Sequence, residues 1–237
     1  MKIKIRIKQA LQSFMKWVTA CDGETEKMLS MILRHSRQDA RILDVGCGYG
    51  RNLRTLRAAG FLQVMGVEKN SQIVKEVCQD GYACFGIEEF AQMSETFDVI
   101  LMSHVIEHFS PDTLLVFIDN YLDRLVPGGK LVIATPLLGD CFYDDFDHIK
   151  PYLPTGILNV FGKSGAQVQF YSRNRLELSD LWFRRGYHKF VYYRAAYVKG
   201  RMTWLLRLVN VFSALIFRAS FGWIGKVDGW IGVFKKC

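Results

Sequence analysis

The sequence predicts an α/β fold with a doubly wound, mostly parallel sheet, an N-terminal helical extension and a C-terminal insertion before the last strand. From residue 41, short apolar runs alternate with segments of helical spacing, which is the pattern of βαβ units. Half of the 237 residues are apolar and only 23% are charged, so the chain can bury a sizeable core. This length fits one domain with an appended lobe and excludes two full enzyme domains.

Five apolar runs predict the parallel strands in chain order: residues 41–45, 62–67, 82–86, 97–102 and 130–134. The spacing between them predicts helices over residues 50–59, 71–80 and 111–125. The last helix has the clearest ends, because Ser110 suits its N-cap and Pro111 its first helical position. Pro127-Gly128-Gly129 is expected to stop it.

The flanking segments are less regular. Within residues 1–40, helical spacing places five apolar side chains on one face: Ile3, Ile7, Leu11, Phe14 and Val18. The first eight residues also alternate between apolar and basic side chains, as a strand would. Of the two, we favour the helix. After residue 135 we expect a short helix over 155–164 and strands over 167–171 and 229–234. The chain then divides into four parts: a basic helical extension 1–40, a core 41–172, a basic aromatic insertion 173–226 and a closing strand 227–237.

Charge is distributed unevenly along the chain. The formal net charge is +8, but residues 163–237 hold 14 basic and three acidic side chains, a net +11, whereas residues 1–162 carry a net −3. The first 16 residues add five basic side chains before any acid appears. An anionic partner is therefore expected at both ends of the chain.

The six cysteines form no C-x-x-C pair and have no clustered histidine partners, which excludes a zinc motif and fits a reducing, cytoplasmic compartment. The basic N-terminus lacks the apolar stretch of a cleaved signal. Residues 204–224 approach the length of a membrane span but are interrupted by Arg207, Asn210 and Arg218. We expect a helix that lies on a membrane rather than one that crosses it.

A strand that runs into glycines is the most specific motif. Ile42–Val45 leads into Gly46-Cys47-Gly48-Tyr49-Gly50, where glycines let the backbone turn sharply and approach a ligand, and a helix follows. Arg51 stands where a dinucleotide motif needs another small residue, which argues against NAD and FAD. Glu68, 22 residues after Gly46, ends the next strand, where a carboxylate can accept hydrogen bonds from both hydroxyls of a ribose.

Four motifs occur in order over roughly residues 40–136: ILDVGCGYG, VEKN, FDVILMSHVIEHF and LVPGGKLVIATP. Together they resemble the class I S-adenosylmethionine-dependent methyltransferase family of the small-molecule type. The resemblance implies a Rossmann-like fold, S-adenosylmethionine as cofactor and methyl transfer as the activity.

The same resemblance implies a set of cofactor-binding residues. It places the glycine loop around the methionine moiety, Glu68 at the ribose and Lys69 beside the adenine. Many relatives carry an aspartate where Ile87 stands, so adenine binding here would rely on backbone groups and packing. The implied set is Asp44, Gly46, Cys47, Gly48, Gly50, Glu68, Lys69, Gly86, Ile87, Glu88 and Ser103.

Methylation of a hydroxyl needs a base, and histidine is the usual one near neutral pH. The candidate bases are His104, Glu107 and His108, which follow the fourth strand, and His148, whose segment caps the acceptor pocket in the methyltransferases it resembles. Of these, we expect Glu107 to be an ordinary surface acid. The acids around residue 145 come from one loop, so no metal site is expected.

Basic and aromatic residues alternate through the insertion 173–226, and an apolar helix follows within it. Such a segment suits lipid headgroups, phosphorylated sugars or nucleic acid, and the apolar helix favours an anionic membrane surface. The sequence leaves open a buried lid or a homodimer contact for that helix. We thus expect a methyltransferase acting on a small-molecule, glycoconjugate or lipid-linked acceptor, cytoplasmic or membrane-associated. The alternatives are an RNA methyltransferase, disfavoured because no N-P-P-Y-type tetrapeptide follows the fourth strand, and a non-catalytic S-adenosylmethionine-binding protein.

Overall fold

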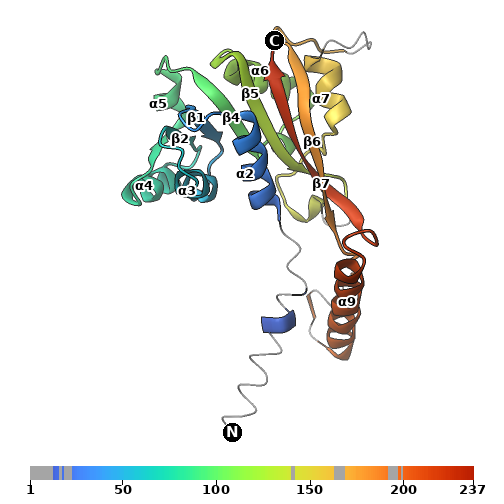
Figure 1. Cartoon of the computed structure of the whole chain (residues 1–237). Coiled ribbons are helices and arrows are strands. Elements are labelled where there is room, and N and C mark those ends of the chain that lie inside the picture. Colours follow the sequence, from blue (N-terminus) through green and yellow to red (C-terminus); the bar gives the residue numbers. More distant parts are fainter. Residues whose placement is uncertain are drawn as a thin grey trace. The chain divides into compact units, whose positions relative to one another are not determined.

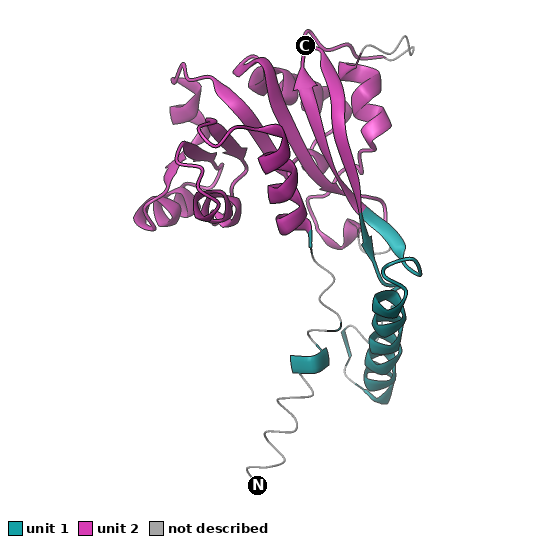
Figure 2. Ribbon diagram, viewed as in Figure 1, with its two compact units in different colours: residues 1–23, 184–228 teal, residues 24–183, 229–237 magenta. Residues whose placement is uncertain are grey.

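The computed structural model describes residues 13–15, 18, 23–139, 142–162, 169–191, 197–198 and 200–237. The chain forms two compact units, drawn in different colours in Figure 2. Unit 1 comprises residues 1–23 and 184–228, and unit 2 comprises residues 24–183 and 229–237.

Unit 2 is built on a mostly parallel sheet, as the sequence predicts. The strands of the described chain follow the spatial order β3-β2-β1-β4-β5-β7-β6 (Figure 1). Pairing is parallel from β3 to β5, and β7 lies antiparallel to β5. The strands are β1 Ile42–Val45, β2 Val64–Val67, β3 Ala83–Phe85, β4 Phe97–Ser103, β5 Leu125–Pro136, β6 Leu176–Gly186 and β7 Lys226–Lys236.

Alternate residues of the strands feed two apolar clusters, one on each face of the sheet. In β4, Val99 and Leu101 join one cluster, whereas Ile100 and Met102 join the other, because successive side chains of a strand point to opposite faces. The first face is covered by α2 Glu24–His35, α3 Arg51–Ala58 and α4 Ser71–Gln79. The second is covered by α5 Ile87–Ala91, α6 Pro111–Leu122 and α7 Pro154–Phe161. Helices on both faces confirm the doubly wound architecture.

Helix α6 ends earlier than its sequence pattern predicts. It begins at Pro111 after Ser110 as expected, but its last helical residue is Leu122 rather than residue 125. Strand β5 already begins at Leu125, so Pro127-Gly128-Gly129 lies inside that strand. The pairing with β4 shifts register between Phe97 and Val99, because the proline and glycines form an irregular segment in β5 rather than a helix stop.

The sixth strand also differs from the prediction. Of the strand expected at 167–171, residues 167 and 168 lie outside the described chain, and residues 169–171 form no strand. The strand is β6, whose sequence LELSDLWFRRG falls in the segment predicted as a basic aromatic insertion, residues 173–226. β6 is the outermost strand, where one side can face water, so polar residues are tolerated there. The connection between β6 and β7 is therefore residues 187–225.

Unit 1 contains helix α9, Arg201–Ala219. Its small described core consists of Val18, Tyr187 and Ala214, with Val211 and Phe217 against them. Ala214 is the one buried residue of α9. By length and composition alone, this helix is long and apolar enough to cross a membrane.

The amphipathic face expected in residues 1–40 is described only in part, since Ile3, Ile7 and Leu11 lie outside the described residues. Phe14 and Val18 are helical, and α2 supplies the regular helix of that segment.

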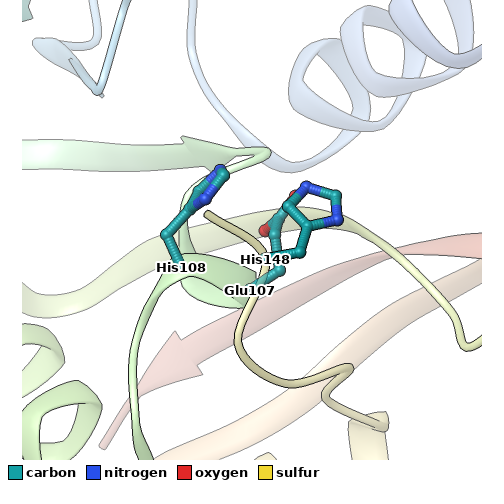
Figure 3. A group of neighbouring side chains, drawn as sticks. All are labelled: Glu107, His108 and His148. Atoms are coloured by element: carbon teal, nitrogen blue, oxygen red, sulfur yellow. The ribbon is translucent and has the colours of Figure 1, made fainter. Parts of the chain in front are cut away.

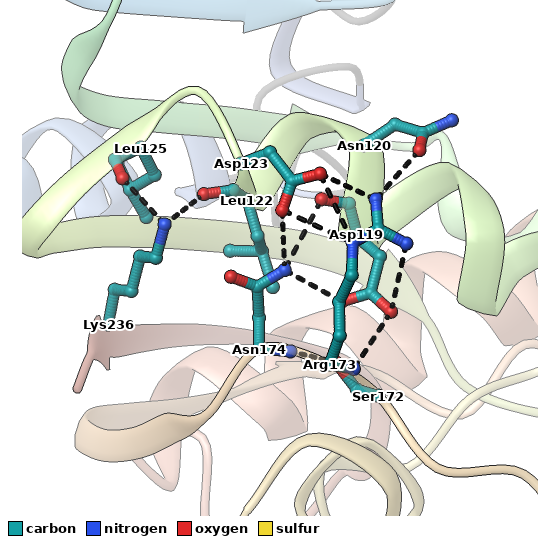
Figure 4. Close-up of polar contacts among 9 residues, drawn as sticks. All are labelled: Asp119, Asn120, Leu122, Asp123, Leu125, Ser172, Arg173, Asn174 and Lys236. Carbon is teal, nitrogen blue, oxygen red and sulfur yellow. Dashed lines mark hydrogen bonds and ion pairs between the residues drawn. The ribbon is translucent and has the colours of Figure 1, made fainter.

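A buried carboxylate fixes the chain at the entry to β6 (Figure 4). Asp119 of α6 is 3% exposed and accepts hydrogen bonds from the hydroxyl of Ser172, the backbone N–H of Arg173 and the amide of Asn174. Arg173 also pairs with Asp123 one turn further along α6. Because Asp119 satisfies donors that would otherwise be buried without acceptors, this cluster holds the 172–174 segment against α6.

We expect Asp119→Ala to lower the free energy of unfolding by about 2 to 4 kcal/mol, since it leaves the Ser172 hydroxyl and the Arg173 N–H without their acceptor and removes one acceptor of the Asn174 amide. Urea denaturation measures the change. The matched control is Asn120→Ala, whose exposed side chain accepts one bond from Arg173 and should cost at most about 0.5 kcal/mol. Equal losses in both variants would show that Asp119 does not anchor the segment.

Candidate active site

The carboxyl ends of β1, β2 and β4 meet at a cavity of about 430 Å³ in unit 2. β1 lies between β2 and β4, so the direction of winding changes there, and open α/β sheets bind ligands at such a point. The cavity is lined by Val45, Gly46, Val67, Glu68, Lys69, Ile87, His104, Val105, His108, Phe109, Phe117, Tyr121 and Asp147. Six of the predicted site residues are therefore brought together on one surface.

The glycine loop has the backbone that its sequence requires. Gly46, Gly48 and Gly50 all have positive φ angles, of 69°, 50° and 75°. A Cβ at Gly46 would lie 2.8 Å from Cγ2 of Val105, so a side chain at this position would collide with the loop after β4. Gly50 is the N-cap of α3, whose first turn has no acidic residue. The loop thus presents bare backbone to the cavity.

Asp44 lies beneath this loop and is fully buried. Burial raises the pKa of its carboxyl to about 7, although a hydrogen bond from Asn52 acts in the opposite direction. Its Oδ2 has no hydrogen-bond partner among the described residues, and neither does Oγ of Ser103 at the end of β4. Buried oxygens without partners fit a ligand that brings donors, such as an ammonium group.

Glu68 ends β2 and faces the same loop. One carboxylate oxygen accepts the N–H of Gly48 at 3.1 Å, and the other accepts the N–H of Asn70 at 3.0 Å. A carboxylate has about four acceptor positions, so each oxygen keeps one for a ligand hydroxyl. Lys69 and Ile87 line the cavity beside Glu68.

The other predicted cofactor residues lie behind this lining. Gly86 is the N-cap of α5, and Glu88 lies in the first turn of that helix. Cys47 is buried between Gly46 and Gly48. Asp44, Gly48, Gly50 and Ser103 also do not contribute to the lining.

His104 links two acids rather than standing free. Its Nε2 lies 2.7 Å from Oε1 of Glu24, and its Nδ1 lies 3.3 Å from Oε1 of Glu107. Burial favours the neutral ring, but the hydrogen bonds to Glu107 and Glu24 outweigh it and raise the pKa of His104 to about 9. The ring is therefore charged at neutral pH and unsuited to take up a proton there. Its backbone has a φ of 57°, which non-glycine residues rarely adopt.

The sequence places neither Glu24 nor Glu107 in the site. Glu24 begins α2, 80 positions before its partner, and no local pattern could connect the two. Glu107 was expected at the surface but is fully buried, where its Oε2 accepts the hydroxyl of Thr135. Glu107 follows His104 by three residues, shortly after the buried strand β4 ends. This spacing is the signal that could have placed Glu107 beside His104.

Glu107, His108 and His148 form a compact group (Figure 3). Each offers one ligand or proton-accepting atom, and these atoms lie within 4.8 Å of one another. Nδ1 of His148 lies 2.7 Å from the carbonyl oxygen of Phe142, and Nδ1 of His108 lies 3.1 Å from that of Asp147. A carbonyl only accepts, so each of these Nδ1 atoms donates its proton, and Nε2 of His148 lies 3.6 Å from Oδ2 of Asp145. The group can accept protons, and its donor types also suit a divalent cation.

The comparisons with known proteins agree with this geometry. The family described as "Methyltransferase domain" matches residues 19–202. A ubiquinone biosynthesis O-methyltransferase of Parvibaculum lavamentivorans is 34% identical over 106 residues, which cover 41% of this chain and 41% of that protein. The match thus spans about two fifths of the length of this curated relative.

Two solved structures show the same fold. A SAM-dependent methyltransferase from Archaeoglobus fulgidus has a TM-score of 0.55 at 19% identity, with 90% of this chain and 95% of that chain covered. Coclaurine N-methyltransferase, bound to N-methylheliamine and SAH, has a TM-score of 0.55 at 15% identity, with 89% and 72% covered. The resemblance found in the sequence motifs is confirmed. The chain belongs to the methyltransferase domain family and has the fold of the S-adenosylmethionine-dependent methyltransferases.

Proposed function

We propose that this chain transfers a methyl group from S-adenosylmethionine to a hydroxyl of a small-molecule acceptor carrying an apolar tail, at the cytoplasmic surface of a membrane. The observation that carries the proposal is that one cavity joins the glycine loop and Glu68 to His108, whose ring contacts that of His148. The choice of a hydroxyl is supported by the O-methyltransferase name of the curated relative.

The residues around the glycine loop fit the cofactor. Oδ2 of Asp44 has no hydrogen-bond donor among the described residues. It can therefore pair with the ammonium group of the cofactor's methionine part. Glu68 can accept both ribose hydroxyls, with Lys69 and Ile87 beside the adenine. Bound S-adenosylmethionine supplies an electrophilic methyl on a sulfonium. The protein then has to align the acceptor oxygen and remove its proton.

His148 is the base that the geometry favours. Its side chain is 12% exposed, Nδ1 lies 2.7 Å from the carbonyl oxygen of Phe142, and Nε2 lies 3.6 Å from Oδ2 of Asp145. His108 likewise places Nδ1 beside a carbonyl oxygen and contacts His148 edge-on, with ring centroids 4.9 Å apart. His104 instead holds Glu107 in place, because it is the charged partner of that buried carboxylate.

Two apolar surfaces support an acceptor with an apolar tail and a membrane location. In unit 2, five large apolar side chains between β5 and α7 are exposed, close in sequence to His148: Leu138, Tyr143, Phe146, Ile149 and Leu153. In unit 1, α9 exposes Trp204, Leu208, Phe212 and Leu215, which recur every three or four residues and so share one helical face. An apolar face flanked by basic residues is typical of helices that lie in a membrane interface.

The turn after α9 extends this apolar character. Phe221, Trp223 and Ile224 are all exposed, and Phe221 is 94% exposed. With the net charge of +11 over residues 163–237, insertion of these side chains would combine with attraction to anionic lipids.

For the cofactor, we expect Glu68→Ala and Gly48→Val to weaken binding of S-adenosylmethionine, measured by titration calorimetry. Each ribose bond to the carboxylate contributes about 1.5 to 3 kcal/mol, and valine at a φ of 50° distorts the loop. Glu89→Ala on the exposed side of α5 is the control and should bind as the parent does. Parent-like affinity in both site variants would refute this placement of the cofactor.

For the base, we expect His148→Asn to lower turnover about 10²- to 10⁴-fold with phenolic acceptors bearing an alkyl tail, while cofactor affinity stays unchanged. His188→Asn, an exposed histidine of unit 1, is the control.

The same assay separates proton transfer from cation binding. With His148 as base, a chelator such as EDTA should leave the parent's rate unchanged. Loss of activity on chelation, restored by an added divalent cation, would instead assign Glu107, His108 and His148 to a metal ion.

For the membrane, we expect the protein to float with vesicles containing anionic phosphatidylglycerol, and less with neutral vesicles. Each basic residue near the surface contributes about 1 kcal/mol, an attraction that salt weakens while apolar insertion persists. Trp204→Glu with Phe212→Glu should abolish flotation, whereas Leu62→Glu, at an exposed apolar position of unit 2, should not.

Three outcomes would count against the membrane surface. If the protein does not float with anionic vesicles at low salt, α9 would be a lid. If it forms a dimer whose population rises with protein concentration, α9 would be a contact between copies. If RNA releases the protein from vesicles, a nucleic-acid partner would be favoured.

A further inference from the structure

Two cysteines meet at the base of the glycine loop. Cys47 belongs to that loop, and Cys84 lies in the middle of β3. Their Sγ atoms are 3.5 Å apart, and both residues are buried, at 6% and 3% exposure. The mechanism proposed above uses neither thiol.

A glycine makes this contact geometrically feasible. Gly66 of β2 is the register partner of Cys84, and β2 lies between β1 and β3. A Cβ at position 66 would lie 2.6 Å from Sγ of Cys47, so any side chain there would separate the two sulfurs. The absence of a side chain at Gly66 is what lets the loop cysteine reach the strand cysteine.

We propose that Cys47 and Cys84 are a redox-responsive pair, which a peroxide oxidises to a disulfide that weakens cofactor binding. The inference rests on the proposed role of the glycine loop in holding the cofactor. It adds a covalent modification site that the methyl-transfer reaction does not use.

The chemistry balances with hydrogen peroxide as oxidant. The thiolate of one cysteine attacks the peroxide, the O–O bond breaks, and a sulfenic acid and one water form. The second thiol then attacks that sulfur, the S–O bond breaks, a second water leaves and the S–S bond forms. The two cysteines lose two electrons and two protons in total, and the peroxide is reduced to water.

Cys84 is the better nucleophile of the two. The contact between the two thiols lowers the pKa of Cys84 and raises the pKa of Cys47. Since both thiols are buried, peroxide reaches them when the glycine loop opens. A bound cofactor that holds the loop should therefore slow the oxidation.

The disulfide would act on binding through the loop. A sulfur–sulfur bond is about 2.0 Å long, so the sulfurs must approach by about 1.5 Å, and Cys47 is drawn toward β3. Its neighbour Gly48 donates its N–H to Glu68, and Gly46 forms part of the cavity lining. A shift of Cys47 thus displaces both of its neighbours, the Gly48 N–H that Glu68 accepts and the Gly46 backbone that lines the cavity.

The test compares reduced and peroxide-treated protein of full length. After treatment and alkylation of free thiols, peptide mass spectrometry should find Cys47 joined to Cys84, with a mass loss of two hydrogens. Calorimetry should then show at least tenfold weaker binding of S-adenosylmethionine, which dithiothreitol restores. Cofactor added before the peroxide should slow formation of the bridge.

Cys84→Ala is the decisive variant, because it removes the partner thiol without touching the loop. It should bind cofactor like the reduced parent and keep that affinity after peroxide. Cys237→Ser, which changes an exposed cysteine directly after β7, should stay as sensitive as the parent. If Cys84→Ala proves unstable, Cys84→Ser replaces it.

Two results would overturn the proposal: a bridged protein with unchanged affinity, or no bridge between these cysteines after treatment. If Cys84→Ala loses affinity for S-adenosylmethionine after peroxide treatment, the proposal is also overturned, since another oxidation would then be responsible. If the reduced parent fails to bind S-adenosylmethionine at all, the proposed function fails instead, and the bridge can still be scored by mass.

Discussion

The parallel pairing of β1 with both β2 and β4 is the constraint on which the site depends. Parallel strands end at the same edge of a sheet, so this pairing brings together residues from three separated stretches of the chain. β1 contributes the glycine loop, β2 contributes Glu68, and β4 contributes His104. Helices on the two faces bury the strands between them, and at this edge backbone and polar groups face a cavity.

The three histidines near this edge show how packing assigns different properties to one residue type. His104 lies between two buried carboxylates and is held in its charged form. His108 and His148 instead donate through Nδ1 to carbonyl oxygens. The ion pair with His104 also balances the charge of Glu107, so that this buried carboxylate is not left unpaired beside His108 and His148.

Features that depend on neighbouring residues could be predicted from the sequence, whereas features that depend on distant contacts could not. The parallel strands, the glycine loop and the position of Glu68 follow from patterns of a few residues, and the structure has them where expected. The link from Glu24 to His104 joins segments 80 positions apart and leaves no local mark. β6 escaped the pattern because an edge strand needs less apolar sequence, and Glu107 because burial of an acid depends on partners brought by the fold.

The strands β6 and β7 are neighbours in the sheet, and the connection between them carries α9. Both ends of residues 187–225 therefore emerge from adjacent strands, the situation in which a tight hairpin turn can close the chain. A segment joined in this way can lengthen, shorten or be exchanged without changing the order of the strands that build the cavity. The fold thus separates a connection that can vary in length from the strands that position the site residues.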